Sequence, residues 1–225
     1  IQNSRTILRR FVRDNGSDTD VERAADELSR CRRKVINADS VERVRGIEGD
    51  AATYYFGVFP HLILNQKESF VFKGRNRRPP KDAVNAMLSF VYTLISNDVT
   101  AALETVGLDP YVGFMHALRP GRPSLALDIM EELRAYLGDR LVLSLINRKQ
   151  ITGNQFLQQG DESIIMTDDA RRTIISAWQA RKKEQIQHPF LNEKVSIGLL
   201  PHIQAMMLAR YLRNDLDDYP VFLIQ

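Results

Sequence analysis

Apolar side chains recur every three or four residues along most of the chain, which is the spacing of helices with one buried face. Short polar residues, glycines and prolines divide this pattern into segments. The pattern predicts helices that begin near Asn3, Asp20, Ser40, Pro79, Ser124, Asp168 and Glu193. Residues 163–167, Ser-Ile-Ile-Met-Thr, are the best candidate for a short strand. The sequence therefore predicts a mainly α fold, a multi-helix domain with at most one or two short strands.

Capping and helix-breaking residues set the expected helix boundaries. Asp20, Ser40 and Ser124 are expected N-caps, because a short polar side chain there can accept hydrogen bonds from the first free N–H groups. Pro60 is expected to end the helix that begins at Ser40, since proline lacks the N–H that a helix interior needs. Gly107 is expected to end the long helix before it, because glycine is the usual residue just past a helix C-terminus.

The composition is that of an ordinary globular protein, large enough to bury a core. Hydrophobic residues make up 44% of the 225 residues and charged residues 26%. Cys31 is the only cysteine, which excludes an intrachain disulfide and predicts a small buried hydrophobe. No run approaches about 18 uninterrupted apolar residues, so we expect no membrane span. The chain begins at Ile1 without a methionine or a secretory signal, so we expect a truncated or cleaved start.

Positive charge is concentrated in one stretch of the chain. The net charge is only +3, which by itself does not indicate a nucleic-acid partner. Residues 73–81, however, hold five cations and no anion: Lys73, Arg75, Arg77, Arg78 and Lys81. Such a segment either contacts backbone phosphates without reading base sequence or forms a solvated loop. The residues alone leave both interpretations open.

Two acids on one predicted helix are the first candidate site. Asp128 and Glu131 are three residues apart, so they lie on the same helix face, about 4.5 Å apart along the axis. Carboxylates that close repel each other unless a cation or a proton lies between them. A bound divalent cation would explain them among apolar neighbours. The alternative is a solvated acidic face near a helix N-terminus, where the helix dipole favours acids.

A histidine and a glutamate elsewhere in the chain are further candidates. His116 lies fifteen residues before Glu131, in a turn whose following loop can fold back over the helix start. It precedes Arg119 and Arg122, two cations suited to phosphate, although a lone histidine is often structural. Glu48 has small residues on both sides, which would permit close approach by another element, but it also fits a surface position.

Other known site patterns are absent from the sequence. It contains no P-loop, no dinucleotide glycine fingerprint, no Glu-x-x-His pair and no His-Glu-x-x-His zinc motif. His61, His188 and His202 have no ligand-like neighbours in the sequence. The aromatic residues Tyr54, Tyr55 and Trp178 are expected in the core and not as surfaces for base stacking.

Several of these segments together resemble a known family. They are residues 46–52 (Gly-Ile-Glu-Gly-Asp-Ala-Ala), 74–85, 113–116 (Gly-Phe-Met-His), 119–131, 141–148 and 219–222. In this order they resemble the CRISPR adaptation integrase, the first-numbered CRISPR-associated protein. The resemblance covers nearly the whole chain. The segment from His116 to Glu131 is the one that is specific by itself.

The resemblance implies an activity and a place in a larger protein. Members of the family are metal-dependent DNA endonucleases and integrases, which insert spacer DNA into the CRISPR array by phosphodiester transfer. They carry an N-terminal β-domain before a helical catalytic domain. This chain, residues 1–225, looks like the helical catalytic domain without that β-domain. The implied location is the prokaryotic cytoplasm, with no membrane partner.

The resemblance also implies the site residues, the cofactor and the partners. The catalytic metal ligands would be Glu48, His116 and Glu131. Asp128 would be either an alternative ligand or a group that contacts a ligand without binding the metal itself. Two carboxylates and an imidazole suit Mn²⁺, and Mg²⁺ less strictly. The implied DNA-binding residues are Arg75, Arg77, Arg78, Lys81, Arg119 and Arg122. The implied partners are double-stranded or branched DNA, a second copy in the full-length protein, and the small second adaptation protein.

Two other functions remain open at this point. The chain could be a non-catalytic helical module for DNA binding or assembly, inactive as a fragment. It could also be a helical scaffold that a metal ion stabilises, with no role on DNA. Neither explains why the acids, the histidine and the arginines are grouped as they are.

Overall fold

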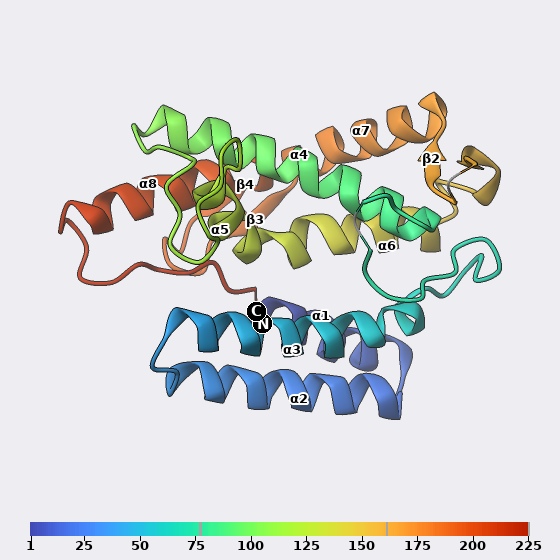
Figure 1. The fold of residues 1–225 in the computed structure, drawn as a ribbon, viewed down its shortest axis with the longest axis horizontal. Coiled ribbons are helices and arrows are strands. Elements are labelled where there is room, and N and C mark those ends of the chain that lie inside the picture. The colour runs from blue at the N-terminus through green and yellow to red at the C-terminus, as the bar shows by residue number, and fades with distance from the viewer. Residues whose placement is uncertain (77, 161, 225) are drawn as a thin grey trace. The chain divides into compact units, whose positions relative to one another are not determined.

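The computed structural model describes residues 1–76, 78–160 and 162–224 and confirms the mainly α class (Figure 1). The α-helices are α1 (Gln2–Asn15), α2 (Thr19–Ile36), α3 (Val41–Gly57), α4 (Ala83–Thr105), α5 (Ser124–Leu133), α6 (Arg140–Asn147), α7 (Asp168–Lys183) and α8 (Leu200–Leu212). Shorter helical turns are η1 (Phe59–Leu62), η3 (Gly153–Gln155) and η4 (Ile197–Leu199), and η2 (Arg134–Asp139) is a π-helical segment.

Strands form two small antiparallel sheets in the described part of the chain. The strand expected at residues 163–167 is β2 (Ile164–Met166), and it pairs with β1 (Phe156–Gln158). The second sheet pairs β3 (Gln185–Gln187) with β4 (Lys194–Ser196). The apolar pattern wrongly predicted that the helix from Asp168 extends over β3 and that the last helix already begins before β4. β3 and β4 each contain a single apolar residue, whereas β2 contains three in a row, so only β2 could be recognised in the sequence.

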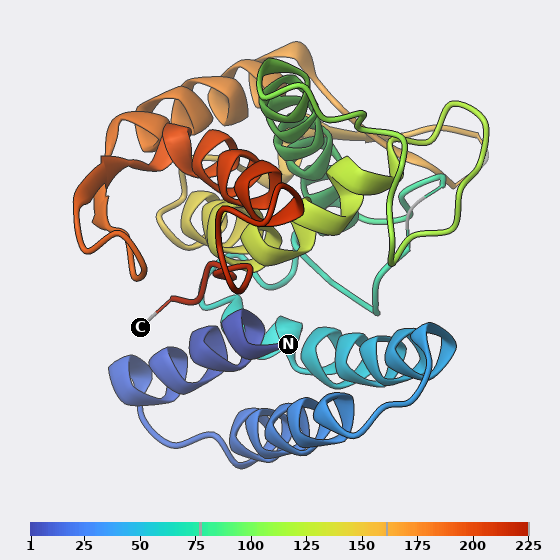
Figure 2. The same cartoon turned by 90° about the vertical axis from the view of Figure 1, so that its left-hand side faces the viewer.

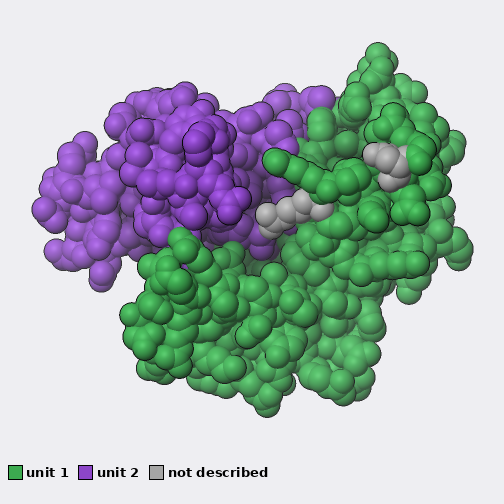
Figure 3. Space-filling model, in the orientation of Figure 1, with its two compact units in different colours: residues 1–90, 139–174 green, residues 91–138, 175–225 purple. Residues whose placement is uncertain are grey.

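The chain divides into two compact units, which Figure 3 distinguishes by colour. Unit 1 comprises residues 1–90 and 139–174, and unit 2 comprises residues 91–138 and 175–225. In unit 1, α1, α2 and α3 lie side by side, with α2 against both of the others (Figures 1 and 2). Cys31 is buried on α2, which confirms the prediction that it is a small buried hydrophobe.

Some helix boundaries agree with the capping residues and others do not. Ser40 caps α3 as predicted, and its Oγ accepts a hydrogen bond from the Arg43 N–H at 3.3 Å. The cap of α2 is Asp18 and not Asp20, because the Asp18 carboxylate accepts from the N–H groups of Asp20 and Val21. The third helix ends at Gly57, and Pro60 belongs to the short turn η1 that follows.

The long helix α4 begins later than predicted and ends as predicted. Its first residue is Ala83 and not Pro79, since the Asp82 carboxylate accepts from the Asn85 N–H at 2.7 Å and so caps the helix. Gly107 has a φ of 80°, the left-handed conformation of a residue just past a helix end. The Leu108 N–H then reaches back to the Leu103 carbonyl at 2.9 Å.

Helix α4 is long and apolar enough to cross a membrane by length and composition, the one such helix in the described chain. Half of its apolar window is buried inside the protein. Val84, Met87, Leu88, Val91 and Ile95 have no exposed surface. The apolar stripe of this helix is therefore accounted for as core.

In unit 2, α5 packs against α8, and the π-helical segment η2 continues from α5. Gly138 allows η2 to lie close to α4. A Cβ atom at Gly138 would be 2.9 Å from the Tyr92 ring and 3.2 Å from Ile95. The helix that carries the two candidate acids is thus packed tightly at its C-terminal end.

Candidate metal centre

The loop of residues 106–123 folds back over the start of α5 and satisfies its free N–H groups. The Pro110 carbonyl accepts from Leu125 at 2.9 Å and from Ala126 at 3.2 Å. Ser124, expected as the N-cap, is buried in the first turn and donates its hydroxyl to the Ala117 carbonyl at 3.1 Å. The prediction that Ser124 caps the helix is therefore wrong. Its hydroxyl holds the loop, because loop carbonyls surround it.

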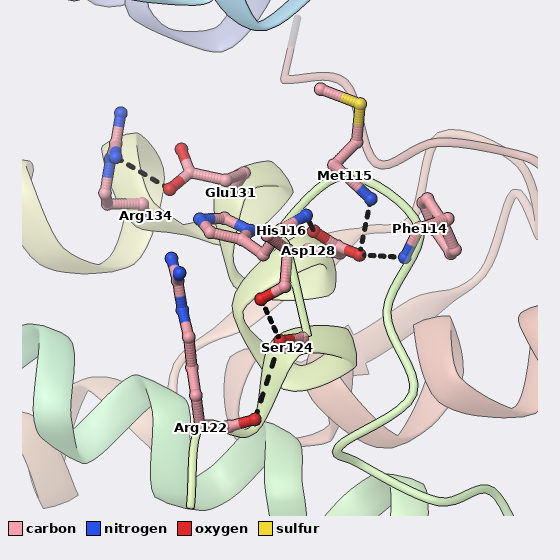
Figure 4. A network of polar contacts seen from close by, with 9 residues as sticks. Phe114, Met115, His116, Arg122, Ser124, Asp128, Glu131 and Arg134 are labelled. Atoms are coloured by element: carbon pink, nitrogen blue, oxygen red, sulfur yellow. Dashed lines mark hydrogen bonds and ion pairs between the residues drawn. The ribbon is translucent and has the colours of Figure 1, made fainter. Parts of the chain in front are cut away.

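Asp128 is the acceptor around which this loop is organised (Figure 4). Its side chain is 1% exposed. It accepts from the N–H groups of Phe114 at 2.7 Å, Met115 at 3.0 Å and His116 at 2.9 Å, and from His116 Nδ1 at 2.7 Å. A carboxylate has about four acceptor sites, so these four contacts use all of them.

Gly113 is the position where the loop comes closest to α5. A Cβ atom there would lie 2.7 Å from Asp128 Oδ2 and 2.7 Å from the backbone carbon of Ser124. Contacts this short do not occur between real Cβ atoms and their neighbours, so no side chain fits. The glycine in the Gly-Phe-Met-His segment therefore permits the hydrogen bonds that follow it.

The hydrogen bond to Asp128 sets the tautomer of His116. Burial raises the pKa of the Asp128 carboxyl, but the hydrogen bonds from His116 and from three N–H groups lower that pKa by more, so it lies below its usual value. An ionised carboxylate accepts only, so Nδ1 of His116 carries the ring proton. Nε2 then keeps the lone pair with which histidine binds metal ions.

Glu131 lies one turn farther along α5 and is partly open to solvent. Its side chain is 25% exposed, and it accepts from Arg134 Nη1 at 2.8 Å. The Arg134 guanidinium in turn lies 5.7 Å from the centroid of the Tyr92 ring. In Figure 4 the side chains of His116, Glu131, Arg122 and Arg134 extend to the same side of α5.

Helix α5 also carries a third acid, Glu132, which the sequence reasoning did not single out. It accepts from Tyr219 Oη at 2.6 Å, from Gln204 Nε2 at 2.8 Å and from the Phe222 N–H at 2.9 Å. Two of the three acids on this helix are thus engaged by donors from elsewhere in the chain. Glu131, held by Arg134, is the most open of the three to an incoming group.

Glu48 belongs to α3 and so to unit 1, whereas His116 and Glu131 belong to unit 2. The Glu48 side chain is half-buried. Gly46 and Gly49 on either side of it are exposed, and a Cβ atom at either would meet nothing within 4 Å. Within the ranges that the structure describes, no other element packs against these two glycines, so the close approach that their small size would permit is not seen at either position.

The basic loop is organised by one of its own arginines. Arg75 donates from Nη1 to Asn85 Oδ1 at 2.7 Å and from Nη2 to Ser89 Oγ at 3.1 Å. Asn85 also accepts from the Asn76 N–H and donates to the Gly74 carbonyl. The guanidinium of Arg75 therefore ties the loop to the first turns of α4.

The other candidate DNA-binding cations differ in exposure. Arg78 and Arg119 are exposed and Arg122 is half-buried. Lys81 is exposed and lies 3.6 Å from Glu162 in a weak ion pair. Arg77 lies outside the described residues. Among the described residues we find no ion pair for Arg78, Arg119 or Arg122.

A second group with metal-ligand chemistry lies in unit 1. The ligand atoms of Asp18, Asp20 and His61 are within 4.8 Å of one another. His61 Nδ1 lies 2.8 Å from Asp18 Oδ2, so the interpretation that His61 has no ligand-like neighbours is wrong. The sequence could not reveal this because 43 residues separate the pair. Asp18 is already engaged as the cap of α2, and Asp20 is 3.5 Å from Arg23.

The aromatic residues behave as expected with one exception. Trp178 and Tyr55 are buried, and the Tyr55 hydroxyl donates to the buried Asp139 at 3.0 Å. Tyr54 is 40% exposed, so its assignment to the core is wrong. Neighbours on a helix point about 100° apart, and the apolar stripe of α3 includes Tyr55 but not Tyr54.

Comparisons with known proteins agree with the resemblance seen in the sequence. The family described as CRISPR associated protein Cas1 matches residues 1–180. An endonuclease named Cas1 2 from Rhodospirillum rubrum is 52% identical over 98% of this chain. The Cas1 endonuclease of Leptospira interrogans is 46% identical, covering 99% of this chain and 89% of its own length. The chain spans 66% of the length of the Rhodospirillum rubrum relative.

A similar fold occurs among solved structures. A chain of the solved Cas6-RT-Cas1–Cas2 complex superposes with a TM-score of 0.83 at 25% identity. The match covers 100% of this chain and 24% of that one. In that solved chain, the matching fold is therefore one part of a longer protein.

Proposed function

Because this chain belongs to the family of Cas1 proteins, we propose that it is the helical catalytic domain of a metal-dependent DNA endonuclease and integrase. In this proposal it inserts spacer DNA into a CRISPR array in the prokaryotic cytoplasm. One observation carries the proposal beyond family membership. His116 is fixed by Asp128 in the tautomer that leaves Nε2 free to bind a metal ion, and Glu131 lies on the same side of α5.

The residues of this chain fit a divalent cation. Glu48, His116 and Glu131 offer two carboxylates and one imidazole, a set that suits Mn²⁺ and also Mg²⁺. When bound, the cation polarises a phosphodiester oxygen and stabilises the leaving alkoxide.

Asp128 acts in this proposal as the group that orients His116, and not as a ligand. All of its acceptor sites are engaged by Phe114, Met115 and His116, so binding a cation would cost it those bonds. A carboxylate hydrogen-bonded to a metal-binding histidine fixes the ring orientation and makes the free nitrogen a better ligand.

The arginines near the centre hold the phosphate that reacts. Arg119 and Arg122 lie three and six residues after His116 in the chain, and a planar guanidinium donates two parallel hydrogen bonds to a phosphate. A DNA 3′-hydroxyl attacks the phosphorus in strand transfer, and the 3′-oxygen of the target strand leaves. One phosphodiester bond replaces another, so the reaction needs no energy from a nucleoside triphosphate.

The basic loop of residues 73–81 and its partners complete the proposal. Arg78 and Lys81 contact backbone phosphates of double-stranded or branched DNA, and we extend this role to Arg77. Arg75 contributes mainly by holding the loop through Asn85 and Ser89. The full-length protein forms a homodimer and a complex with the small second adaptation protein. The Cas1–Cas2 assembly with the same fold supports this partner.

The test is strand transfer on a branched half-site DNA with Mn²⁺. Glu48→Ala, His116→Ala and Glu131→Ala should each abolish turnover, because each removes one ligand of the cation. The matched controls are Glu42→Ala, an exposed acid on the same helix as Glu48, and His202→Ala, a half-buried histidine of α8. Both controls should retain wild-type turnover, and thermal melting should show that all five variants fold.

Two results would overturn parts of this proposal. Activity in all three ligand variants would mean that the metal site is wrongly assigned. Salt-sensitive DNA binding by the wild type without any turnover or Mn²⁺ binding would support the alternative function, a non-catalytic helical module for DNA binding or assembly. A metal-stabilised scaffold would instead show a chelator-sensitive melting temperature without DNA affinity.

A further inference from the structure

We infer that a partly buried series of hydrogen bonds through His188, Gln204, Glu132 and Tyr219 positions α5, so that Glu132, Gln204 and Tyr219 are positioning residues for the proposed metal centre. The chain of hydrogen bonds ties α5 to α8 and to the C-terminal segment, all within unit 2. The inference has two parts. The mechanical part, that these hydrogen bonds hold α5 and the His116 loop in place, does not depend on the proposed function. The functional part, that they thereby support metal binding, rests on the proposed metal site.

The Glu132 carboxylate is the point where the hydrogen bonds converge. Tyr219 Oη donates to its Oε1 at 2.6 Å, and Gln204 Nε2 and the Phe222 N–H donate to its Oε2 at 2.8 Å and 2.9 Å. Three donors from two distant segments thus meet one acid on α5. A carboxylate suits this place because it only accepts, whereas an amide would bring a donor against donors.

The directions of these bonds are consistent from one end to the other. His188 Nδ1 accepts from the N–H groups of Phe190 and Leu191 at 3.3 Å and 3.2 Å, so its Nε2 carries the ring proton. That proton points to Gln204 Oε1, 3.3 Å away, which leaves the Gln204 amide nitrogen directed at Glu132. Reversing the amide of Gln204 would place donor against donor at His188, so a single arrangement satisfies every group.

Burial makes this arrangement costly to break. His188, Gln204 and Phe222 have no exposed surface. The Phe222 ring packs 5.7 Å from the Tyr136 ring and 5.9 Å from the His188 ring, measured between centroids. Residues 217–224 form no helix or strand, so the Glu132 bonds and the Phe222 contacts hold this segment in place. A buried polar group that loses its partner is not compensated by water.

The same helix is held at a second point by Asp128. Asp128 and Glu132 are four residues apart, so they lie on one face of α5, about 6 Å apart along its axis. Asp128 binds the loop that carries His116, and Glu132 binds α8 and the C-terminal segment. Glu131 lies between them. Loosening the Glu132 attachment should therefore shift both Glu131 and the His116 loop.

Two variants test this coupling, each with a matched control. Tyr219→Phe removes one hydroxyl and keeps the ring, and its control is Tyr211→Phe, which changes a 40% exposed tyrosine of α8. Gln204→Met removes the amide and keeps its volume, and its control is Gln179→Met, which changes an exposed glutamine of α7 in the same unit. Gln204→Met and Tyr219→Phe leave every proposed metal ligand intact.

Amide hydrogen exchange measures the mechanical part without reference to function. Exchange of the Phe114, Met115 and His116 amides, which donate to Asp128, should be at least fivefold faster in Tyr219→Phe and Gln204→Met. The control variants should leave exchange at these amides unchanged. Unchanged protection at residues 114–116 in folded Tyr219→Phe and Gln204→Met protein would reduce the network to a local attachment of the C-terminal segment and overturn the inference.

Mn²⁺ titration followed by electron paramagnetic resonance measures the functional part. The dissociation constant should rise about tenfold in Tyr219→Phe and in Gln204→Met, the scale of losing a group that orients a ligand. Wild-type protein that binds Mn²⁺, with variants that bind equally well, would overturn the inference and leave the proposed function intact. Wild-type protein that binds no Mn²⁺ would overturn the proposed function, and the exchange result would then decide the mechanical part. If one variant fails to fold, the other decides.

Discussion

Asp128 and Glu131 illustrate how far the surroundings of a residue decide its role. Both are acids on one face of α5, and nothing in their spacing separates them. The fold surrounds Asp128 with three N–H groups and the His116 ring, and leaves Glu131 with Arg134 and a quarter of its side chain exposed. A carboxylate with all of its acceptor sites engaged is a poor metal ligand and a good orienting group.

The close approach at Gly113 leads to a prediction. Gly113→Ala should destabilise the protein by about 1–3 kcal/mol, because the new Cβ atom meets Asp128 and Ser124 at 2.7 Å and must displace the loop. Gly49→Ala is the control, with nothing within 4 Å in the interior of α3, and should stabilise by about 0.5–1 kcal/mol. Urea unfolding of both variants measures these changes. Effects of the same sign would contradict the described loop geometry.

At the scale of elements, two helix caps of the same residue type differ in their electrostatic surroundings. The side-chain hydrogen bond from His61 lowers the pKa of Asp18 below its ordinary value of 3.8, with help from the Val21 N–H. Burial raises the pKa of Asp82 above 3.8, although hydrogen bonds from Asn85 oppose it. The two caps should therefore respond to pH in opposite directions.

The prediction compares Asp18→Asn with Asp82→Asn. A lowered pKa contributes stability above pH 3.8 that is lost as pH falls through the folded-state value. A raised pKa contributes stability below pH 3.8 that is lost as pH rises through the folded-state value. The difference in unfolding free energy between wild type and variant should grow with pH for Asp18→Asn and shrink with pH for Asp82→Asn. Urea unfolding between about pH 3 and pH 6 measures it, and equal slopes would refute the assignment.

Element boundaries also show where local signals compete. Proline at positions 79 and 80 suits a first helical turn, yet α4 begins only at Ala83, after its cap Asp82. The structure places Gln185–Gln187 and Lys194–Ser196 in a small sheet, where the apolar pattern predicted the ends of two helices. Pairing between strands depends on a partner segment, which a local window does not contain.

At the scale of the whole molecule, the DNA binding proposed for the basic residues leads to a prediction about salt dependence. Arg78→Ala should reduce the slope of log affinity against log salt by about 0.9, the value for one phosphate contact on a duplex. The control is Arg172→Ala, an exposed arginine of α7 that lies 3.8 Å from Asp169. It should leave the slope unchanged. Affinities measured between about 50 and 200 mM salt test this, and an equal loss of slope in both variants would show that only net charge matters.

The sequence by itself determined the fold class, the family and the identity of the candidate ligands. Periodicity of apolar residues is a local property, so it identified the helices, and the ordered segments around Glu48 and His116 identified the family. Tertiary structure decided which acid of α5 is engaged and which is open, the tautomer of His116 and the pairing of His61 with Asp18. It also decided the attachment of the C-terminal segment to Glu132. These features depend on hydrogen bonds and burial between residues far apart in the chain, which only the folded molecule brings together.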